Sequence, residues 1–259
     1  MSAVSERVPE RAGNRRLAWA VLAAAVVEIV APLVTINGPG SSPGGGSGPD
    51  LLITPVGWAF SIWGVIYTLA VVQAIAVLVH GERAVSRRLQ IDLLVLYLGG
   101  TLWIALAGLD SSLATAAALL VMFVAAFDAV MTASREMIQP RRLAALTRAA
   151  VGLYAGWVTA AFFLNISTAL VDAGAFEPDE LSWQIGVLLV AGVTLWAVLI
   201  RSGGILAYAA AGVWAMVGIA VTGQDDETTP VVVVALVAAV VLVLTTLAVR
   251  PSRSGPRTS

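Results

Sequence analysis

Eight apolar segments, each close to the length of a membrane-spanning helix, make up most of this 259-residue chain. They are 17–36, 51–79, 91–109, 113–133, 149–171, 182–200, 202–222 and 230–249. A helix crosses a bilayer with about 20 apolar residues, whereas a barrel strand needs about ten residues of alternating polarity. Only 12% of the residues are charged and 59% are hydrophobic, while soluble domains carry about 25% charged residues. The sequence therefore predicts an all-α integral membrane protein with eight transmembrane helices.

Arginine occurs only on alternate connections between these segments. All 15 positive side chains lie in 1–16, 80–90, 134–148 and 250–259 or at Arg201, and the other connections carry only acidic charges. Cytoplasmic loops of membrane proteins are rich in arginine and lysine, so both tails, 1–16 and 250–259, are predicted to be cytoplasmic. We expect a multi-pass protein of the cytoplasmic (inner) membrane. Its arginines would touch anionic headgroups of the lipid bilayer rather than nucleic acid.

The sequence lacks the residues from which several common sites are built. It has no cysteine and a single histidine, His80, which excludes thiolate sites and histidine-based metal clusters. It has no glycine-rich phosphate loop and no Ser-His-Asp set. We therefore expect no metal site, no required cofactor and no enzyme with conventional catalytic groups.

Aromatic residues are concentrated in 54–67, at the start of the second apolar segment. Phe60, Trp63 and Tyr67 are spaced three and four apart, so a helix would align them in one stripe. Trp58 precedes the stripe near the membrane surface, where an interfacial aromatic belt also explains it. Counted from the predicted helix ends, three indoles fall near the bilayer midplane, those of Trp63, Trp103 and Trp157.

A second cluster lies in 153–165. One helical face there carries an indole, two apolar side chains and, at its edge, an amide: Trp157, Ala161, Leu164 and Asn165. Gly152 and Gly156 form a pair of small residues on a different face, where we expect close helix packing.

Both clusters resemble signatures of the TspO/MBR family, the tryptophan-rich sensory proteins related to translocator protein. The second-helix signature is matched by Pro55, Trp58, Phe60, Trp63 and Tyr67. The fifth-helix signature is matched by Tyr154, Trp157, Val158, Ala161, Leu164 and Asn165. The third helix matches at Tyr97 and Trp103 but has Gly100 where the family has a ligand-contacting asparagine. The resemblance covers about 17–171, a five-helix region, and leaves 182–249 as three additional transmembrane helices.

The resemblance implies a pocket between the helices, capped by the Gly/Pro/Ser-rich loop 37–50, for porphyrins, sterols or other flat hydrophobic molecules. The residues expected to bind such a ligand are Trp58, Phe60, Trp63, Tyr67, Trp103, Trp157, Ala161, Leu164 and Asn165. Indoles at one depth would offer a flat, polarisable surface. A porphyrin or heme is favoured over a sterol, because 167–172 lacks the tyrosine and basic residue of the family's cholesterol-recognition pattern. Helix packing through bulky aromatics, without any ligand, is the alternative interpretation.

One carboxylic acid is expected deep in the membrane. Glu28 lies in the middle of the first segment, where an ionised side chain costs about 3 kcal/mol. It is either a proton carrier or ligand-pairing acid, or a neutral acid hydrogen-bonded to another helix. Two hypotheses follow: a membrane sensor or binding protein for a porphyrin-type ligand, and a proton-linked secondary transporter of a small hydrophobic solute that uses Glu28. The resemblance also implies two properties of some members, photochemical porphyrin degradation on the same indoles and formation of a homodimer.

Overall fold

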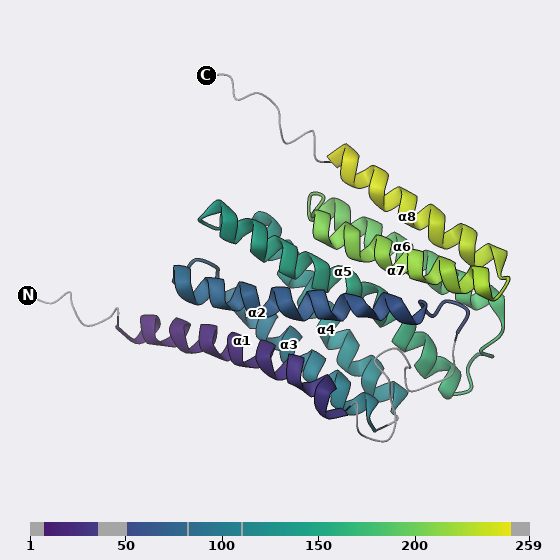
Figure 1. Cartoon of the computed structure of the whole chain (residues 1–259), viewed down its shortest axis with the longest axis horizontal. Helices are drawn as coiled ribbons and strands as arrows, with labels where there is room; N and C mark the ends of the chain where they lie inside the picture. Colours follow the sequence, from purple (N-terminus) through teal and green to yellow (C-terminus); the bar gives the residue numbers. More distant parts are fainter. Residues whose placement is uncertain (1–7, 36–50, 82, 110, 250–259) are drawn as a thin grey trace, which may run out of the picture.

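The computed structural model describes residues 8–35, 51–81, 83–109 and 111–249, and its regular structure is entirely helical (Figure 1). The described residues form eight α-helices: α1 (Val8–Thr35), α2 (Ile62–His80), α3 (Arg87–Ala107), α4 (Ser112–Arg135), α5 (Arg141–Asp172), α6 (Leu181–Arg201), α7 (Leu206–Asp225) and α8 (Thr229–Val249). A short 3₁₀ helix, η1 (Gly57–Ser61), precedes α2. The predicted number of helices is confirmed. The predicted cap, 37–50, lies outside the described residues.

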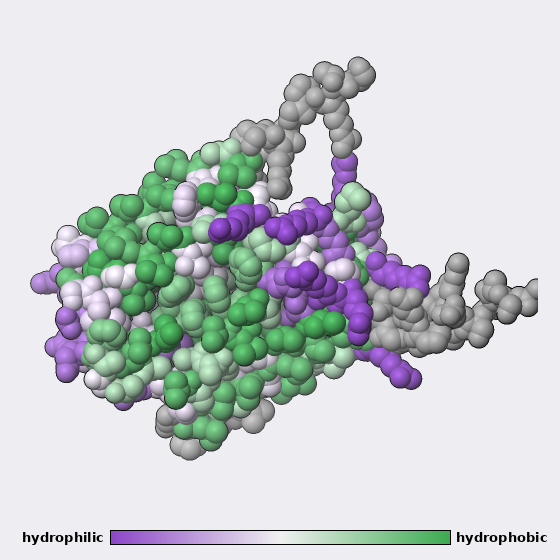
Figure 2. All heavy atoms as spheres, turned by 180° about the vertical axis from the view of Figure 1, so that it is seen from behind, coloured by the Kyte–Doolittle hydropathy of each residue, from purple (hydrophilic) through white to green (hydrophobic). Residues whose placement is uncertain are grey.

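The hydrophobic surface of the helices has the form expected of a membrane protein. Seven helices of the described ranges are long and apolar enough to cross a membrane, with η1 and α2 counted as one span. The remaining helix, α1, joins a charged beginning to the apolar run that starts at Leu17. Figure 2 shows a broad hydrophobic band between more hydrophilic ends of the molecule. The prediction of an all-α, multi-pass membrane protein is confirmed.

The helices pack in two groups that share α5. In the first group, α1 contacts α2 and α3, α3 contacts α4, and both α2 and α4 contact α5, which closes a ring of five helices. In the second group, α5 contacts α6 and α7, and α8 packs against both of these helices. Figure 1 shows α1 and α8 at opposite edges of the molecule, with α5 between them. Side chains of α5 can therefore reach both groups.

Two glycines of α5 allow α7 to approach closely. A Cβ atom at Gly152 would lie 2.7 Å from Cγ2 of Ile205, and one at Gly156 would lie 2.5 Å from the backbone oxygen of Tyr208. The second contact involves main chain, so no side-chain rotation could relieve it. The prediction of close packing at this pair of small residues is confirmed.

The second apolar segment is not helical along its whole predicted length, because α2 begins at Ile62 rather than at residue 51. Pro55 has no N–H for a helical hydrogen bond and disfavours helical backbone in Thr54. The Thr54 hydroxyl accepts a hydrogen bond from Leu51 N–H at 3.0 Å, and Val56 N–H donates to a carbonyl of α7 at 3.1 Å. The segment 51–56 is thus held by turn and interhelical bonds.

The observed ends of α2 and α3 change the depth of two indoles. Trp63 is the second residue of α2, and Trp103 is the fifth residue from the end of α3. Both lie nearer the end of the bundle that carries the acidic loops than the predicted mid-depth. Trp157, by contrast, lies in the middle of α5, as predicted. Helix α5 itself begins at Arg141 rather than residue 149, since arginine, alanine and leucine extend a helix readily.

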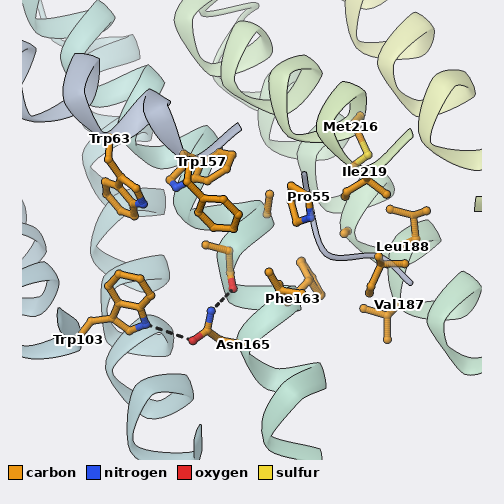
Figure 3. A pocket seen from close by; sticks show the side chains of 16 residues that line it. Pro55, Trp63, Trp103, Trp157, Phe163, Asn165, Val187, Leu188, Met216 and Ile219 are labelled. Atoms are coloured by element: carbon orange, nitrogen blue, oxygen red, sulfur yellow. Dashed lines mark hydrogen bonds between the residues drawn. The ribbon is translucent and has the colours of Figure 1, made fainter. Parts of the chain in front are cut away.

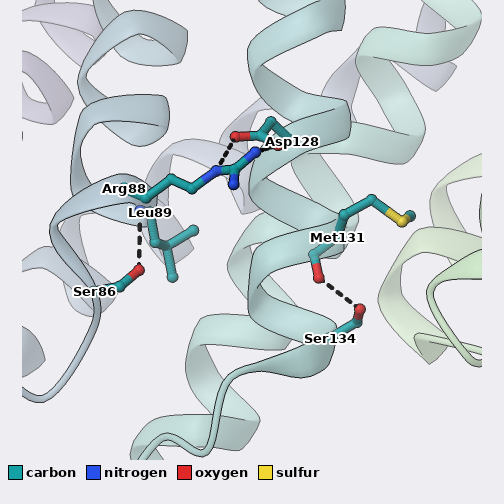
Figure 4. A network of polar contacts seen from close by, with 6 residues as sticks. All are labelled: Ser86, Arg88, Leu89, Asp128, Met131 and Ser134. Carbon is teal, nitrogen blue, oxygen red and sulfur yellow. Dashed lines mark hydrogen bonds and ion pairs between the residues drawn. The ribbon is translucent and has the colours of Figure 1, made fainter.

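An ion pair joins α3 and α4 nearer the arginine-rich end (Figure 4). Arg88 Nε donates to Asp128 Oδ2 at 2.7 Å and Arg88 Nη2 to Oδ1 at 2.5 Å. Ser86 caps α3 by accepting the Leu89 N–H at 3.2 Å. Because the Arg88 side chain is 69% exposed, this pair positions the two helices more than it stabilises them.

Candidate ligand pocket

Three indoles, one each from α2, α3 and α5, converge on one pocket (Figure 3). The rings of Trp63 and Trp103 are stacked, with centroids 6.0 Å apart and an interplanar angle of 29°. The rings of Trp157 and Trp63 are nearly perpendicular, at 86°, and their centroids lie 6.3 Å apart. Phe60, from η1, packs against Trp157 at 5.6 Å and 90°. Since α2, α3 and α5 each contribute one indole, the cluster depends on the closed five-helix ring.

An amide holds one of these indoles in place. Trp103 Nε1 donates a hydrogen bond to Asn165 Oδ1 at 3.1 Å, and Asn165 Nδ2 donates to the Ala161 carbonyl at 3.1 Å (Figure 3). The amide therefore spans α5 and α3 with both of its ends occupied. The indole nitrogen of Trp157 differs, because it is buried and has no acceptor among the described residues. A buried donor without a partner is uncommon and calls for an explanation.

The opposite wall of the pocket is aliphatic. It comes from the segment before η1 and from the second helix group, and consists of Ile53, Pro55, Val187, Leu188, Ala191, Met216 and Ile219. The cavity between this wall and the indoles has a volume of about 40 Å³, within a wider hollow of about 580 Å³ that includes open space. The pocket thus lies where the two helix groups meet. It has room for no more than a few water molecules as it stands.

The structure brings together seven of the nine residues expected to bind ligand. Those that line the pocket are Phe60, Trp63, Trp103, Trp157, Ala161, Leu164 and Asn165. Trp58 does not line it: this indole is 45% exposed and packs edge-on against Trp214, with centroids 4.9 Å apart. Tyr67 does not line the pocket either. Its ring stacks on that of Trp63, with centroids 5.3 Å apart, and so supports this indole.

Helix α7 fixes the position of η1 at the pocket edge. Trp214 Nε1 donates to the Ala59 carbonyl at 2.7 Å, and Gly218 O accepts the Val56 N–H at 3.1 Å. A Cβ atom at Gly218 would lie 2.8 Å from Cβ of Ala59, so only glycine permits this contact. Sequence reasoning missed the contributions of α6 and α7, whose aliphatic residues resemble side chains that face lipid.

Glu28 lies behind the indoles, inside the five-helix ring. Its side chain is fully buried, and its Oε1 accepts a hydrogen bond from the Tyr154 hydroxyl. Its other oxygen, Oε2, has no partner among the described residues. The Tyr154 ring packs edge-on against Trp63 at 5.7 Å. The carboxyl group is therefore one aromatic contact away from the pocket wall.

Gly100 provides the space that this carboxyl group occupies. A Cβ atom at Gly100 would collide with the Glu28 carboxyl group and lie 2.7 Å from the Tyr154 hydroxyl. In this chain a polar group from α1 thus fills the place where the TspO/MBR signature has an asparagine on the third helix. A side chain at residue 100 and the carboxyl group of Glu28 could not both occupy this space.

A model of the family described as TSPO-like protein matches residues 16–248. The chain belongs to the TSPO-like family. The predicted resemblance is confirmed, and the match continues through α6 and α7 to α8, beyond the region 17–171 that carries the signatures. Membership supports the general description of a membrane binding or sensor protein, and the family is generally non-enzymatic. No curated protein and no solved structure matches the chain.

Proposed function

We propose that this TSPO-like protein is a membrane sensor whose ligand is a flat, hydrophobic molecule, with a porphyrin such as protoporphyrin or heme as the best candidate. The observation that carries the proposal is the convergence of Trp63, Trp103 and Trp157 on one cavity. Stacked and edge-on indoles bind an aromatic macrocycle through its face and its rim. The aliphatic wall of α6 and α7 would cover the other face and exclude water.

A polar anchor for the ligand is available at Trp157. Its buried indole N–H has no acceptor among the described residues, and leaving such a donor unpaired costs about 1–3 kcal/mol. An oxygen or nitrogen at the edge of the ligand would satisfy it. We therefore expect the ligand to combine a flat apolar body with at least one hydrogen-bond acceptor.

Binding must open the pocket. The cavity of about 40 Å³ is far below the roughly 300–1,000 Å³ of sites for ligands of this size. Trp103 is half-buried, and one hydrogen bond, to Asn165, holds its indole. The segment 51–56 is not helical. We expect these two parts of the wall to move. A ligand that favours the open arrangement would shift the segment 51–56, which Val56 N–H joins to α7. Such a shift would suit a sensor.

The proposal predicts that Trp157→Phe weakens the binding of protoporphyrin about three- to tenfold, because it removes the indole N–H and part of the aromatic contact. Binding is followed by quenching of tryptophan fluorescence in the detergent-purified protein. Trp196→Phe is the matched control, since Trp196 is exposed and bonds Thr245 at 3.1 Å, away from the pocket residues. Quenching that does not saturate, or that weakens equally in both variants, would argue for partition of the porphyrin into micelles.

A second candidate function rests on Glu28. Its carboxyl group is fully buried and bonded to Tyr154, which touches Trp63 of the pocket wall. A group placed in this way could take up or release a proton as the pocket fills, which would make the protein a proton-linked transporter of a small hydrophobic solute. The arrangement is equally suited to a neutral acid that holds α1 against α5.

Glu28→Gln separates these roles, because glutamine keeps an oxygen that accepts from Tyr154 but cannot exchange the proton. In vesicles loaded with a pH-sensitive dye, a transporter would move protons when protoporphyrin is added outside, and Glu28→Gln would abolish this signal. We expect the affinity for protoporphyrin to stay within about threefold of that of the unmodified protein. No ligand-dependent proton movement in the unmodified protein would leave Glu28 with its structural role alone.

A further inference from the structure

A second hollow lies at the arginine-rich end of the bundle, where α4 turns into α5. It has a volume of about 470 Å³ and is lined by the last residue of α4, the turn 136–139 and the first turns of α5. Three arginines contribute to its wall, namely Arg135, Arg141 and Arg148. It shares no residue with the pocket beside Trp157.

The wall of this hollow carries more positive than negative charge. The ion pair between Arg88 and Asp128 is the only one formed within the described part of the chain, so the three arginines have no acidic partner there. Glu136 also lines the hollow. Its Oε1 accepts the backbone N–H of Ser86 at 2.5 Å, and its Oε2 is buried without a partner among the described residues. One carboxylate against three arginines leaves the wall with a net positive charge.

The backbone fixes one arginine of the wall and also supplies hydrogen-bond donors. Arg148 is held in place because its Nε donates to Ala133 O at 3.0 Å and its Nη2 donates to Glu136 O at 3.2 Å. Helix α5 begins at Arg141 without a side-chain hydrogen bond to its first N–H groups. The start of a helix carries partial positive charge and free N–H donors, which favour an anion.

An apolar side chain lies beside these donors. Met137 also lines the hollow and is 91% exposed, while the adjacent Ile138 is buried. An exposed methionine next to arginines suits a molecule with an anionic head and an acyl chain. We propose that this hollow binds a phosphate group, which either an anionic phospholipid or a soluble phosphate could supply.

The test is a titration of the full-length, detergent-purified protein with phosphatidylglycerol, followed by native mass spectrometry, with phosphatidylcholine as the zwitterionic comparison. R135Q/R141Q is expected to weaken phosphatidylglycerol binding roughly 25-fold, about fivefold for each arginine. Arg148 is kept, because its hydrogen bonds support the turn. R142Q/R201Q is the matched control: it removes two arginines from the same end of the bundle, and neither lines the hollow. It should bind within about threefold of the unmodified protein.

Competition identifies the source of the phosphate group. Displacement of the lipid by inorganic phosphate, lost in R135Q/R141Q, would assign the site to a soluble phosphate; retention of the lipid would assign it to the phospholipid. Equal loss in the two double variants, or no preference for phosphatidylglycerol together with no effect of inorganic phosphate, would overturn the proposal. Circular dichroism checks that each variant is folded. R141Q alone, with an expected fivefold loss, repeats the test if the double variant unfolds.

Discussion

Replacing Gly156 by alanine is expected to lower the free energy of unfolding by about 2–3 kcal/mol, because the added methyl group has no space between α5 and α7. Its Cβ atom would lie 2.5 Å from the backbone oxygen of Tyr208 and 2.8 Å from Cβ of Ala211. Neither atom belongs to a flexible side chain that could rotate away. The two helices must therefore separate, although alanine is the better helix former.

This separation should also reach the ligand pocket, since α7 supplies Met216 and Ile219 to one wall while α5 supplies the indole of Trp157 to the other. Thermal unfolding followed by circular dichroism measures the loss of stability, and protoporphyrin quenching measures the effect on the pocket. Gly186→Ala on α6 makes the same chemical change where nothing lies within 4 Å of the new methyl group. Equal unfolding temperatures for the two variants would show that α5 and α7 tolerate a wider spacing.

The sequence predicts the helices well because its signals are long and redundant. Eight apolar runs and the restriction of arginine to alternate connections independently give the same number of helices. The start of α2 is different, since a segment such as 51–61 is apolar whether or not it is helical. Pro55 was the available signal against a helix there. The bond from Val56 to Gly218 of α7, which fixes the actual path, joins residues far apart in the chain and has no local pattern.

The candidate site was predictable only on the side where the chemistry is distinctive. Indoles and an amide at helical spacing are unusual, so Trp63, Trp157 and Asn165 could be proposed from the sequence. Leu188 and Ile219 line the same cavity, yet they look like any residue that faces lipid or another helix. Periodicity could not assign them either, because almost every face of these helices is apolar.

The largest effect on stability is expected from Gly100→Asn, which introduces the asparagine of the TspO/MBR signature into space that Glu28 occupies. The new side chain would displace the carboxyl group from Tyr154, and its Cβ atom would lie 2.8 Å from Cδ of Glu28. Overpacking costs about 1–3 kcal/mol and the loss of a hydrogen bond to a buried polar group a similar amount, so we expect a total of about 4 kcal/mol.

Glu28→Ala should rescue this variant, because removal of the carboxyl group from α1 frees the volume that an asparagine on α3 needs. Alone, Glu28→Ala leaves the Tyr154 hydroxyl without its acceptor; in the double variant the amide oxygen of the new asparagine can take that place. We therefore expect the double variant to be more stable than Gly100→Asn and the two single changes to be coupled by about 2 kcal/mol. Unfolding measurements on the four proteins of this cycle give the coupling directly. Simple additivity would mean that Glu28 and residue 100 do not compete for one space, and that the glycine on α3 has another cause.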